Sequence, residues 1–280
     1  LNAINTGGDF CHFEPIFRKI ERARILVIDN LLRDEDDISQ TAWREWGHHL
    51  LTRLKRERTI AALALENIVN NIKRLVVYPE NKIVHLSALA AAAATFQPDA
   101  ILLSGSLSDF DFYHPDLIRQ FGDFARSTSI PMLGICGGHQ LLGLAFGARV
   151  VTLDKLEQFE QRERRIYEYQ YRYVRIMENE DPIFADLGSD RSGLLRVWQN
   201  HGLQLDQVPE GFKLLATSYL CHNQMMVKRD DRQLIYSVQF HLEKSFEDWY
   251  KNRTRWQHPN DSRDGRIIFE NFLKEALKWR

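Results

Sequence analysis

The sequence predicts an α/β protein whose central sheet is mostly parallel and is covered by helices on both faces. Two observations predict this fold class. In the first half, short apolar runs typical of buried strands alternate with helical patterns. In the second half, several short strand patterns follow one another, which indicates a smaller antiparallel region. A chain of 280 residues can bury a sizeable core, and with no repeat or linker-like segment we expect one domain over 1–280.

The first predicted strand is 24–29, a β-branched apolar run that ends in Asp-Asn. Apolar residues then recur at helical spacing from Ile38 to Leu54, and again over 59–73. The basic run 53–58 marks either a solvated face or the break between these two helices. Strands and helices alternate after that. Strands are expected at 74–78, which Pro79 closes, and at 99–103 and 130–135, and helices are expected at 88–95 and 115–127.

The second half of the chain begins with a charged run, 154–166, which we expect at the surface. Tyrosines then alternate with polar residues over 167–173, the period of a strand with one face buried, and packing is the expected role of that stripe. The polar segment 244–264 resembles a long loop, and 265–277 forms an amphipathic helix. Between them lie strand patterns at 194–199, 213–217, 223–228 and 234–240.

Composition narrows the function classes. The formal net charge of −1 gives no basis for a nucleic-acid partner. No apolar run approaches the roughly 20 residues that cross a bilayer, and the N-terminus lacks the pattern of a signal peptide. Three cysteines are too few and too scattered for a disulfide framework or a zinc site. We therefore expect a cytoplasmic protein with no membrane partner and no metal.

Cys136 stands at the junction between an apolar strand pattern and a helix rich in small residues. Gly134 and Gly138 flank it in the form Gly-x-Cys-x-Gly, the thiol version of a nucleophile elbow. Such a sharp turn needs small neighbours and pushes the side chain into a cleft. The N-terminus of the helix favours a thiolate there. The alternative is a small buried core cysteine, which the surrounding glycines make the weaker interpretation.

A nucleophilic cysteine needs a base, and the base needs an orienting group. His241 ends a strand pattern and is followed two residues later by Glu243. The carboxylate can reach one imidazole nitrogen while the other nitrogen faces the sulfur. A His-Glu pair at the surface end of a strand is the alternative, since such triads are recognised by geometry and not by position in the sequence.

The segments 134–142, Gly-Ile-Cys-Gly-Gly-His-Gln-Leu-Leu, and 238–243, Val-Gln-Phe-His-Leu-Glu, resemble the two signatures of class I (triad-type) glutamine amidotransferases. Ile101–Ser106 resembles the oxyanion strand and loop of that family. Trp198–Gly202 is similar to its glutamine-holding segment, especially in the small subunit of carbamoyl phosphate synthetases, and Asp264–Leu273 to its closing helix. The resemblance covers about 24–30 and 74–280.

The resemblance implies a flavodoxin-like fold and a glutaminase site. Cys136 would attack the side-chain amide of L-glutamine, His241 would transfer protons and Glu243 would orient His241. The N–H groups of Gly137 and Ser106 would stabilise the oxyanion. The implied reaction yields glutamate and ammonia and needs no cofactor. The residues implied to hold the glutamine are Gly105, Gln140, Asn200, His201, Gly202 and Leu203.

The sequence departs from the family at two functional positions and two longer segments. Leu242 replaces the usual proline between His241 and Glu243. The loop 104–108, Ser-Gly-Ser-Leu-Ser, replaces one with more glycines and a proline, and a positive φ at Ser106 would be strained. The helical region near 31–73 and the loop near 244–264 exceed the family core and are interpreted as insertions that dock a partner or are tolerated.

Three functions fit these patterns. The first is a glutaminase that feeds ammonia to its partner, a separate synthase. The second is a γ-glutamyl hydrolase, which would use the same acyl chemistry on γ-glutamyl amides or peptides. The third is a non-catalytic regulatory subunit of the same fold. The intact residues Cys136, His241 and Glu243 favour the enzymes, and the motifs around Gln140 and Asn200 favour glutamine as the substrate.

Overall fold

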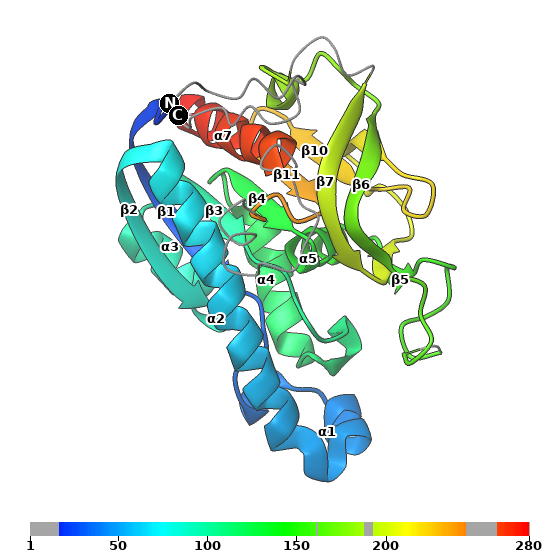
Figure 1. Ribbon diagram of the computed structural model, residues 1–280. Helices are drawn as coiled ribbons and strands as arrows, with labels where there is room; N and C mark the ends of the chain where they lie inside the picture. The colour runs from blue at the N-terminus through cyan, green and yellow to red at the C-terminus, as the bar shows by residue number, and fades with distance from the viewer. Residues whose placement is uncertain (1–16, 161, 188–192, 245–261, 280) are drawn as a thin grey trace, which may run out of the picture.

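The computed structural model describes residues 17–160, 162–187, 193–244 and 262–279 (Figure 1). In these residues nine strands form one mixed sheet of order β2-β1-β3-β4-β11-β10-β9-β6-β7. Five neighbouring strands run parallel: β2 (Val76–His85), β1 (Ile20–Asp29), β3 (Ala100–Leu103), β4 (Met132–Ile135) and β11 (Leu234–Val238). The others pair antiparallel: β10 (Met225–Arg229), β9 (Lys213–Thr217), β6 (Glu168–Ile176) and β7 (Leu194–His201).

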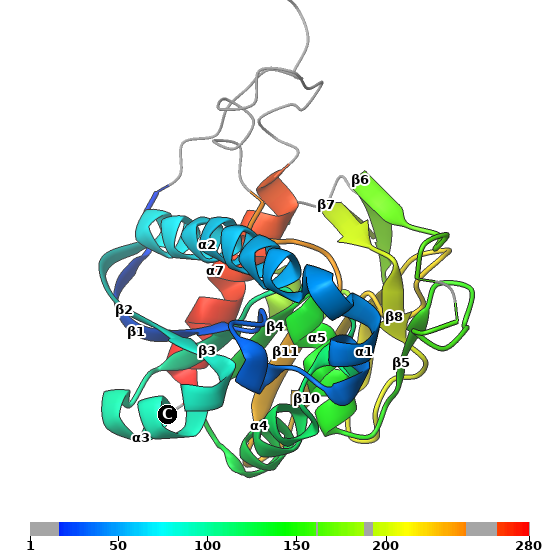
Figure 2. The ribbon, with the colours of Figure 1, turned by 90° about the horizontal axis from the view of Figure 1, so that it is seen from below.

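Helices cover both faces of the parallel half (Figure 2). One face carries α2 (Leu50–Leu75) and α7 (Arg263–Lys278), which pack on one set of alternating strand residues. The other face carries α1 (Gln40–Trp46), α3 (Leu89–Phe96), α4 (Pro115–Ser127) and α5 (Gly137–Ala145). A separate two-stranded antiparallel sheet joins β5 (Val150–Thr152) to β8 (Leu203–Leu205). This is the α/β architecture that the alternating sequence patterns predict.

The short helical turns are of the 3₁₀ type and link the larger elements. They are η2 (Glu35–Asp37), η3 (Gly47–His49), η4 (Leu86–Ala88), η5 (Phe110–Phe112) and η6 (Pro182–Phe184). Among the described helices, none is both long and apolar enough to span a membrane.

The helical region after β1 differs from the predicted pair of helices. α1 ends at Trp46, where Gly47 takes a φ of +47°, and α2 then runs without interruption from Leu50 to Leu75. Of the two alternatives for 53–58, the break between helices is therefore wrong and the solvated face is confirmed. A buried stripe of α2, which includes Leu54 and Ala61, continues through that run, while its other side is exposed at Arg53, Lys55 and Arg56. The basic run is a solvated face of one helix.

Strand β2 continues past Pro79, which was expected to close it. β2 pairs only with β1 among the described strands, and Pro79 lies opposite Ala23 in that parallel ladder. An edge strand tolerates proline because one side of its backbone has no neighbouring strand to receive an N–H. α2 is the crossover helix between these two strands, so the strand starts at Val76, where the helix ends.

Two predictions about the second half also need correction. In β6 the tyrosines lie on the outer side, with Tyr169 and Tyr173 exposed, while Glu168 and Val174 are buried. The rings pack across the strands, and the centroids of Tyr169 and Trp198 are 5.5 Å apart.

The charged run 154–166 is irregular, but not all of it is exposed. Arg162 and Arg165 from this run bind Asp109, and Arg162 also binds Asp111. Most of the predicted loop 244–264 lies outside the described residues.

Candidate active site

Cys136 occupies the turn between β4 and α5. Its φ of +50° and ψ of −102° are strained for a residue with a side chain. Its N–H donates to the carbonyl of Val238 at the end of β11 (2.7 Å). The flanking glycines are sterically required: a Cβ on Gly134 would lie 2.6 Å from the Gly138 oxygen, and one on Gly138 would lie 2.7 Å from the Leu103 oxygen. The sulfur stands at the N-terminus of α5, beside backbone N–H groups that have no partner within the helix.

The structure brings His241 and Glu243 to this cysteine. Nδ1 of His241 lies 2.7 Å from Oε1 of Glu243, and the imidazole forms a hydrogen bond with the Cys136 side chain. The backbone of His241 is held by its N–H bond to the carbonyl of Trp198 in β7 (2.8 Å). Leu242, in the position where the family usually has proline, is buried in the core below this turn. Three residues from two distant segments thus form one hydrogen-bonded chain.

The electrostatics of this chain favour a charged imidazole. Burial works to lower the pKa of His241, but the negative charge of Glu243 and the Cys136 side chain outweigh it and raise that pKa well above its usual value. The protonated imidazole is therefore stabilised between a carboxylate and a sulfur. This arrangement retains a proton on the imidazole that can be given to a leaving group.

The loop 104–108 lies against the N-terminus of α5. A Cβ on Gly137 would be 2.6 Å from Cβ of Ser106 and closer still to the Ser106 nitrogen, so the two backbones are in direct contact. Gly105 lies beside the catalytic pair: a Cβ there would be 3.5 Å from Cε1 of His241. Cys136 has a positive φ, but Ser106 is not among the described non-glycine residues with a positive φ. The loop therefore avoids the strain that a positive φ at Ser106 would bring.

Gln140 and Gln239 form a polar relay beside the sulfur. Nε2 of Gln140 donates to the carbonyl of Leu203 (3.2 Å) and to Oε1 of Gln239 (3.0 Å). Nε2 of Gln239 in turn lies 3.6 Å from Sγ of Cys136. Gln239 is not among the residues predicted from the sequence, although it lies inside the motif that contains His241. Its position between Val238 and Phe240, both fully buried, was the available signal, because a buried amide needs polar partners.

His201 is buried behind the predicted glutamine segment. Its Nδ1 lies 2.9 Å from the carbonyl oxygen of Leu203, and its Nε2 lies 3.1 Å from Oε2 of Glu168. Asn200 is exposed, while Gly202 packs so closely that a Cβ would be 2.9 Å from the Tyr167 ring. The structure thus places His201 where it holds the backbone of this segment from the inner side.

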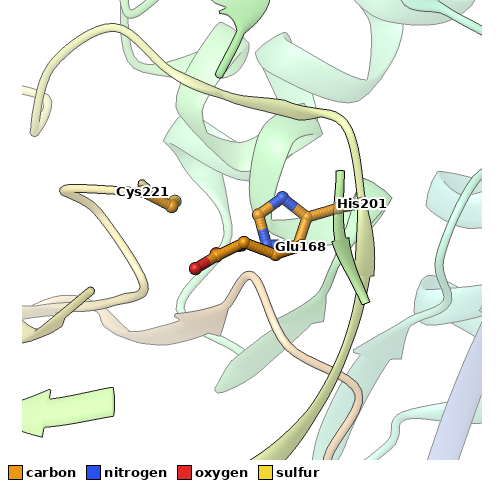
Figure 3. A group of neighbouring side chains, drawn as sticks. All are labelled: Glu168, His201 and Cys221. Atoms are coloured by element: carbon orange, nitrogen blue, oxygen red, sulfur yellow. Dashed lines mark ion pairs between the residues drawn. The ribbon is translucent and has the colours of Figure 1, made fainter. Parts of the chain in front are cut away.

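Glu168, His201 and Cys221 form a buried group of potential metal ligands, with all ligand atoms within 4.8 Å of one another (Figure 3). The Glu168 oxygens already accept hydrogen bonds from Ser218 (2.9 Å) and Gln224 (2.6 Å). Burial, reinforced by Glu168, raises the pKa of the Cys221 thiol well above its usual value. The Glu168 carboxylate, which is tied to Ser218 and Gln224 and lies beside His201, supports the strand that carries His201.

The fold and this arrangement are typical of α/β enzymes with a cysteine nucleophile at a strand–helix turn. The family model "Glutamine amidotransferase class-I" matches residues 63–254. The chain belongs to the class I glutamine amidotransferase family, and it is a glutamine amidotransferase enzyme.

Several relatives are named as GMP synthases. The chain is 30% identical over 177 residues to a glutamine-hydrolyzing GMP synthase subunit of Methanothermobacter thermautotrophicus, covering 62% of this chain and 73% of that protein. It is 31% identical over 165 residues to the corresponding GMP synthase subunit of Pyrococcus abyssi, covering 59% and 76%. The match to the GMP synthase of Ruthia magnifica is 33% identical over 146 residues, covering 52% of this chain and only 25% of that protein. The chain therefore matches about a quarter of that longer synthase.

Solved structures agree on the fold. A candidate GMP synthase subunit from Thermoplasma acidophilum aligns with a TM-score of 0.59 at 24% identity, over 92% of this chain and 96% of that one. A glutamine amidotransferase from Thermotoga maritima aligns with a TM-score of 0.53 at 15% identity, over 91% and 98%. At these identities the likeness establishes the shared fold.

Proposed function

We propose that this chain is a glutaminase component that hydrolyses the side-chain amide of L-glutamine and delivers the ammonia to a separate synthase partner. The observation that carries the proposal is the contact chain of Glu243, His241 and Cys136 beside the loop 104–108. The names of the relatives support a GMP-forming synthase as the acceptor of the ammonia.

In the proposed mechanism, the thiolate of Cys136 attacks the side-chain amide carbon of glutamine. The N–H groups of Gly137 and Ser106 stabilise the tetrahedral oxyanion. His241 gives its proton to the departing nitrogen, the carbon–nitrogen bond breaks, and ammonia leaves a glutamyl thioester on the sulfur. His241 then takes a proton from water, the hydroxide attacks the thioester and the carbon–sulfur bond breaks. Glutamate leaves with its acidic proton released to solvent, which restores the thiolate and the protonated imidazole. Glu243 keeps the imidazole oriented throughout.

Glutamine recognition is proposed to use Gly105, Gln140 and the backbone of Asn200, Gly202 and Leu203. Gln140 already contacts this backbone, since its Nε2 donates to the Leu203 carbonyl (3.2 Å). His201 acts through that backbone, since its ring contacts the carbonyl of Leu203 from the buried side.

The wider proposal keeps 1–280 as a single domain in the cytoplasm. The helical region near 31–73 and the loop near 244–264 remain proposed additions to the family core. The half-reaction consumes glutamine and water alone, so it requires no cofactor.

Glutamate release tests this function. Wild-type protein is expected to release glutamate from glutamine, and Cys136→Ala to lose the activity by roughly 10⁴-fold or more, since the nucleophile is removed. Turnover of γ-glutamyl peptides but not of glutamine would instead establish a γ-glutamyl hydrolase. No turnover of either substrate, even in the presence of a synthase partner, would identify a non-catalytic regulatory protein.

Labelling gives an independent readout of the nucleophile. A glutamine-analogue electrophile is expected to modify Cys136 and to leave Cys221 untouched, because the Cys221 thiol is fully buried and has a raised pKa. Peptide mapping by mass spectrometry would locate the label, and modification of Cys221 or Cys11 instead would contradict the proposal.

A further inference from the structure

A buried carboxylate supports the loop 104–108 from behind. Glu57 projects from α2 and is 1% exposed. Ser108 Oγ donates to its Oε1 at 2.5 Å. Burying a carboxylate costs free energy unless it is compensated. A glutamate held in this position, with its one side-chain bond directed at an active-site loop, therefore calls for a functional reason.

All three serines of the loop are held from the same side. Asn30 at the end of β1 binds Ser104 twice, through its N–H to Oγ (3.0 Å) and through Nδ2 to the carbonyl (2.6 Å). The Tyr113 hydroxyl donates to the carbonyl of Asn30 (2.7 Å) and forms a hydrogen bond with Ser106. Glu57 completes the set at Ser108. The loop thus rests on a polar layer formed by β1, α2 and the turn after η5.

Glu57 is distinct from the other supports of the loop. Asn30 and Tyr113 hold its first part with neutral groups, and Glu57 holds the end from which the chain leaves toward η5. Since Ser108 is two residues from Ser106, movement at Ser108 changes the direction of the Ser106 N–H. An oxyanion donor must be aimed to within a few tenths of an ångström to stabilise a transition state.

We propose that Glu57 is a positioning residue for the glutaminase reaction, which holds the loop 104–108 through Ser108 so that the Ser106 N–H stays directed at the oxyanion. The inference rests on the proposed function of the site. Glu57 touches neither substrate nor reacting atoms, and it acts through Ser108.

The charge of Glu57 adjusts this support. Burial raises its pKa to about 7, against the lowering effects of the Ser108 hydrogen bond, a backbone bond from Leu32 and the charge of Arg58. Asp29, which is paired with Arg58 at 2.5 Å, raises it further. The phenol of Tyr113 also interacts with the charge of this carboxylate. Because an ionised acceptor forms a stronger hydrogen bond with a hydroxyl than a neutral one does, the support tightens as pH rises through neutrality.

The test compares Glu57→Gln, Ser108→Ala and Glu66→Gln in steady-state glutaminase assays between pH 5.5 and 8.5. Glu57→Gln keeps the shape of the side chain and removes its charge, so we expect kcat to fall roughly 3- to 10-fold at pH 8 and to approach wild type at pH 5.5, with KM almost unchanged. Ser108→Ala is expected to lower kcat by about 10-fold across the range. Glu66→Gln, an exposed position on the same helix, serves as the matched control with wild-type kinetics.

Hydrogen–deuterium exchange of the segment 104–109 provides a readout that does not depend on activity. We expect faster amide exchange in Glu57→Gln and Ser108→Ala than in wild type at pH 8, after correction for intrinsic rates. Unchanged exchange in both variants would overturn the inference, as would a ratio of wild-type to Glu57→Gln kcat that does not vary with pH. If wild type itself fails to release glutamate, the proposed function fails, and the exchange data still decide whether Glu57 holds the loop.

Discussion

The elbow around Cys136 and the facing loop 104–108 are positioned by different physics. The elbow is fixed by steric exclusion, since glycines stand where no Cβ fits and the strained Cys136 is bonded to Val238. The loop is fixed by side-chain hydrogen bonds to its serines, one of them to a carboxylate with a pKa near neutrality. Steric exclusion does not depend on pH, so the conformation of the elbow stays the same at any pH. Hydrogen bonds to an ionisable group vary with conditions, so one wall of the site is rigid and the other is adjustable.

The largest effect is expected on the rigid side, where His241 faces the elbow. Glu243→Gln removes the charge that orients the imidazole and stabilises its protonated form, and we expect kcat for glutamate release to fall about 10³-fold. The pKa of His241 should fall as well, so alkylation of Cys136 by iodoacetamide at pH 7 should slow. Both rates can be measured on one preparation. Wild-type alkylation kinetics in this variant would show that Glu243 does not govern the imidazole.

A smaller loss is expected where the two walls meet. Gly137→Ala places a methyl group against Ser106 and displaces the loop, which should reduce kcat/KM by roughly 100-fold. Gly147→Ala is the control: it strains a φ of +91° but meets no atom within 4 Å, so it should lower stability slightly and leave activity intact. Activity near wild type in Gly137→Ala would mean that the loop yields without consequence.

The adjustable side should reveal itself in the pH dependence of stability. Glu57 titrates with a pKa of about 7 in the folded chain against 4.5 for an ordinary glutamate, so between these values the folded state binds more protons than the unfolded state. The free energy of unfolding therefore falls as pH rises from 4.5 to 7, by about 3 kcal/mol from this group. Urea unfolding of Glu57→Gln should lack this decline. If the free energies of unfolding of wild type and Glu57→Gln differed by a constant amount over this pH range, the raised pKa of Glu57 would be refuted.

The smallest effect is expected on the exposed side of α2, next to Glu57. Arg56 precedes Glu57 on α2 but faces solvent. Arg56→Gln should change the free energy of unfolding by less than about 0.5 kcal/mol and leave glutaminase activity unaltered. A larger change in activity would indicate that the exposed face of α2 also acts on the loop.

The sequence predicts the elbow well because its determinants are local. Glycines two residues before and after Cys136 can be recognised without any knowledge of the rest of the chain, and the spacing of His241 and Glu243 is equally short. The strand–helix alternation likewise predicts the parallel half of the sheet, because each period depends on neighbouring residues.

Other features depend on contacts between distant segments. Glu57 is 51 residues from Ser108, and within its helix it is one charged residue in a basic run. Gln239 reaches Cys136 across 103 positions. The side of β6 on which the tyrosines lie also depends on distant contacts, because an alternating pattern is the same whichever face is buried. Sequence periodicity predicts the strand, and only the packed neighbours decide which side meets water.

The place of β11 has a consequence for how this protein matures. β11 is the last strand along the described chain, yet it lies between β4 and β10 near the middle of the sheet. It carries the carbonyl that holds Cys136 and leads directly into His241. A chain emerging from the ribosome therefore exposes its thiol long before its base arrives, and contacts of such sequence separation form slowly. Cys136 therefore lacks its base until β11 inserts between β4 and β10, so completion of the sheet and the onset of catalytic reactivity coincide.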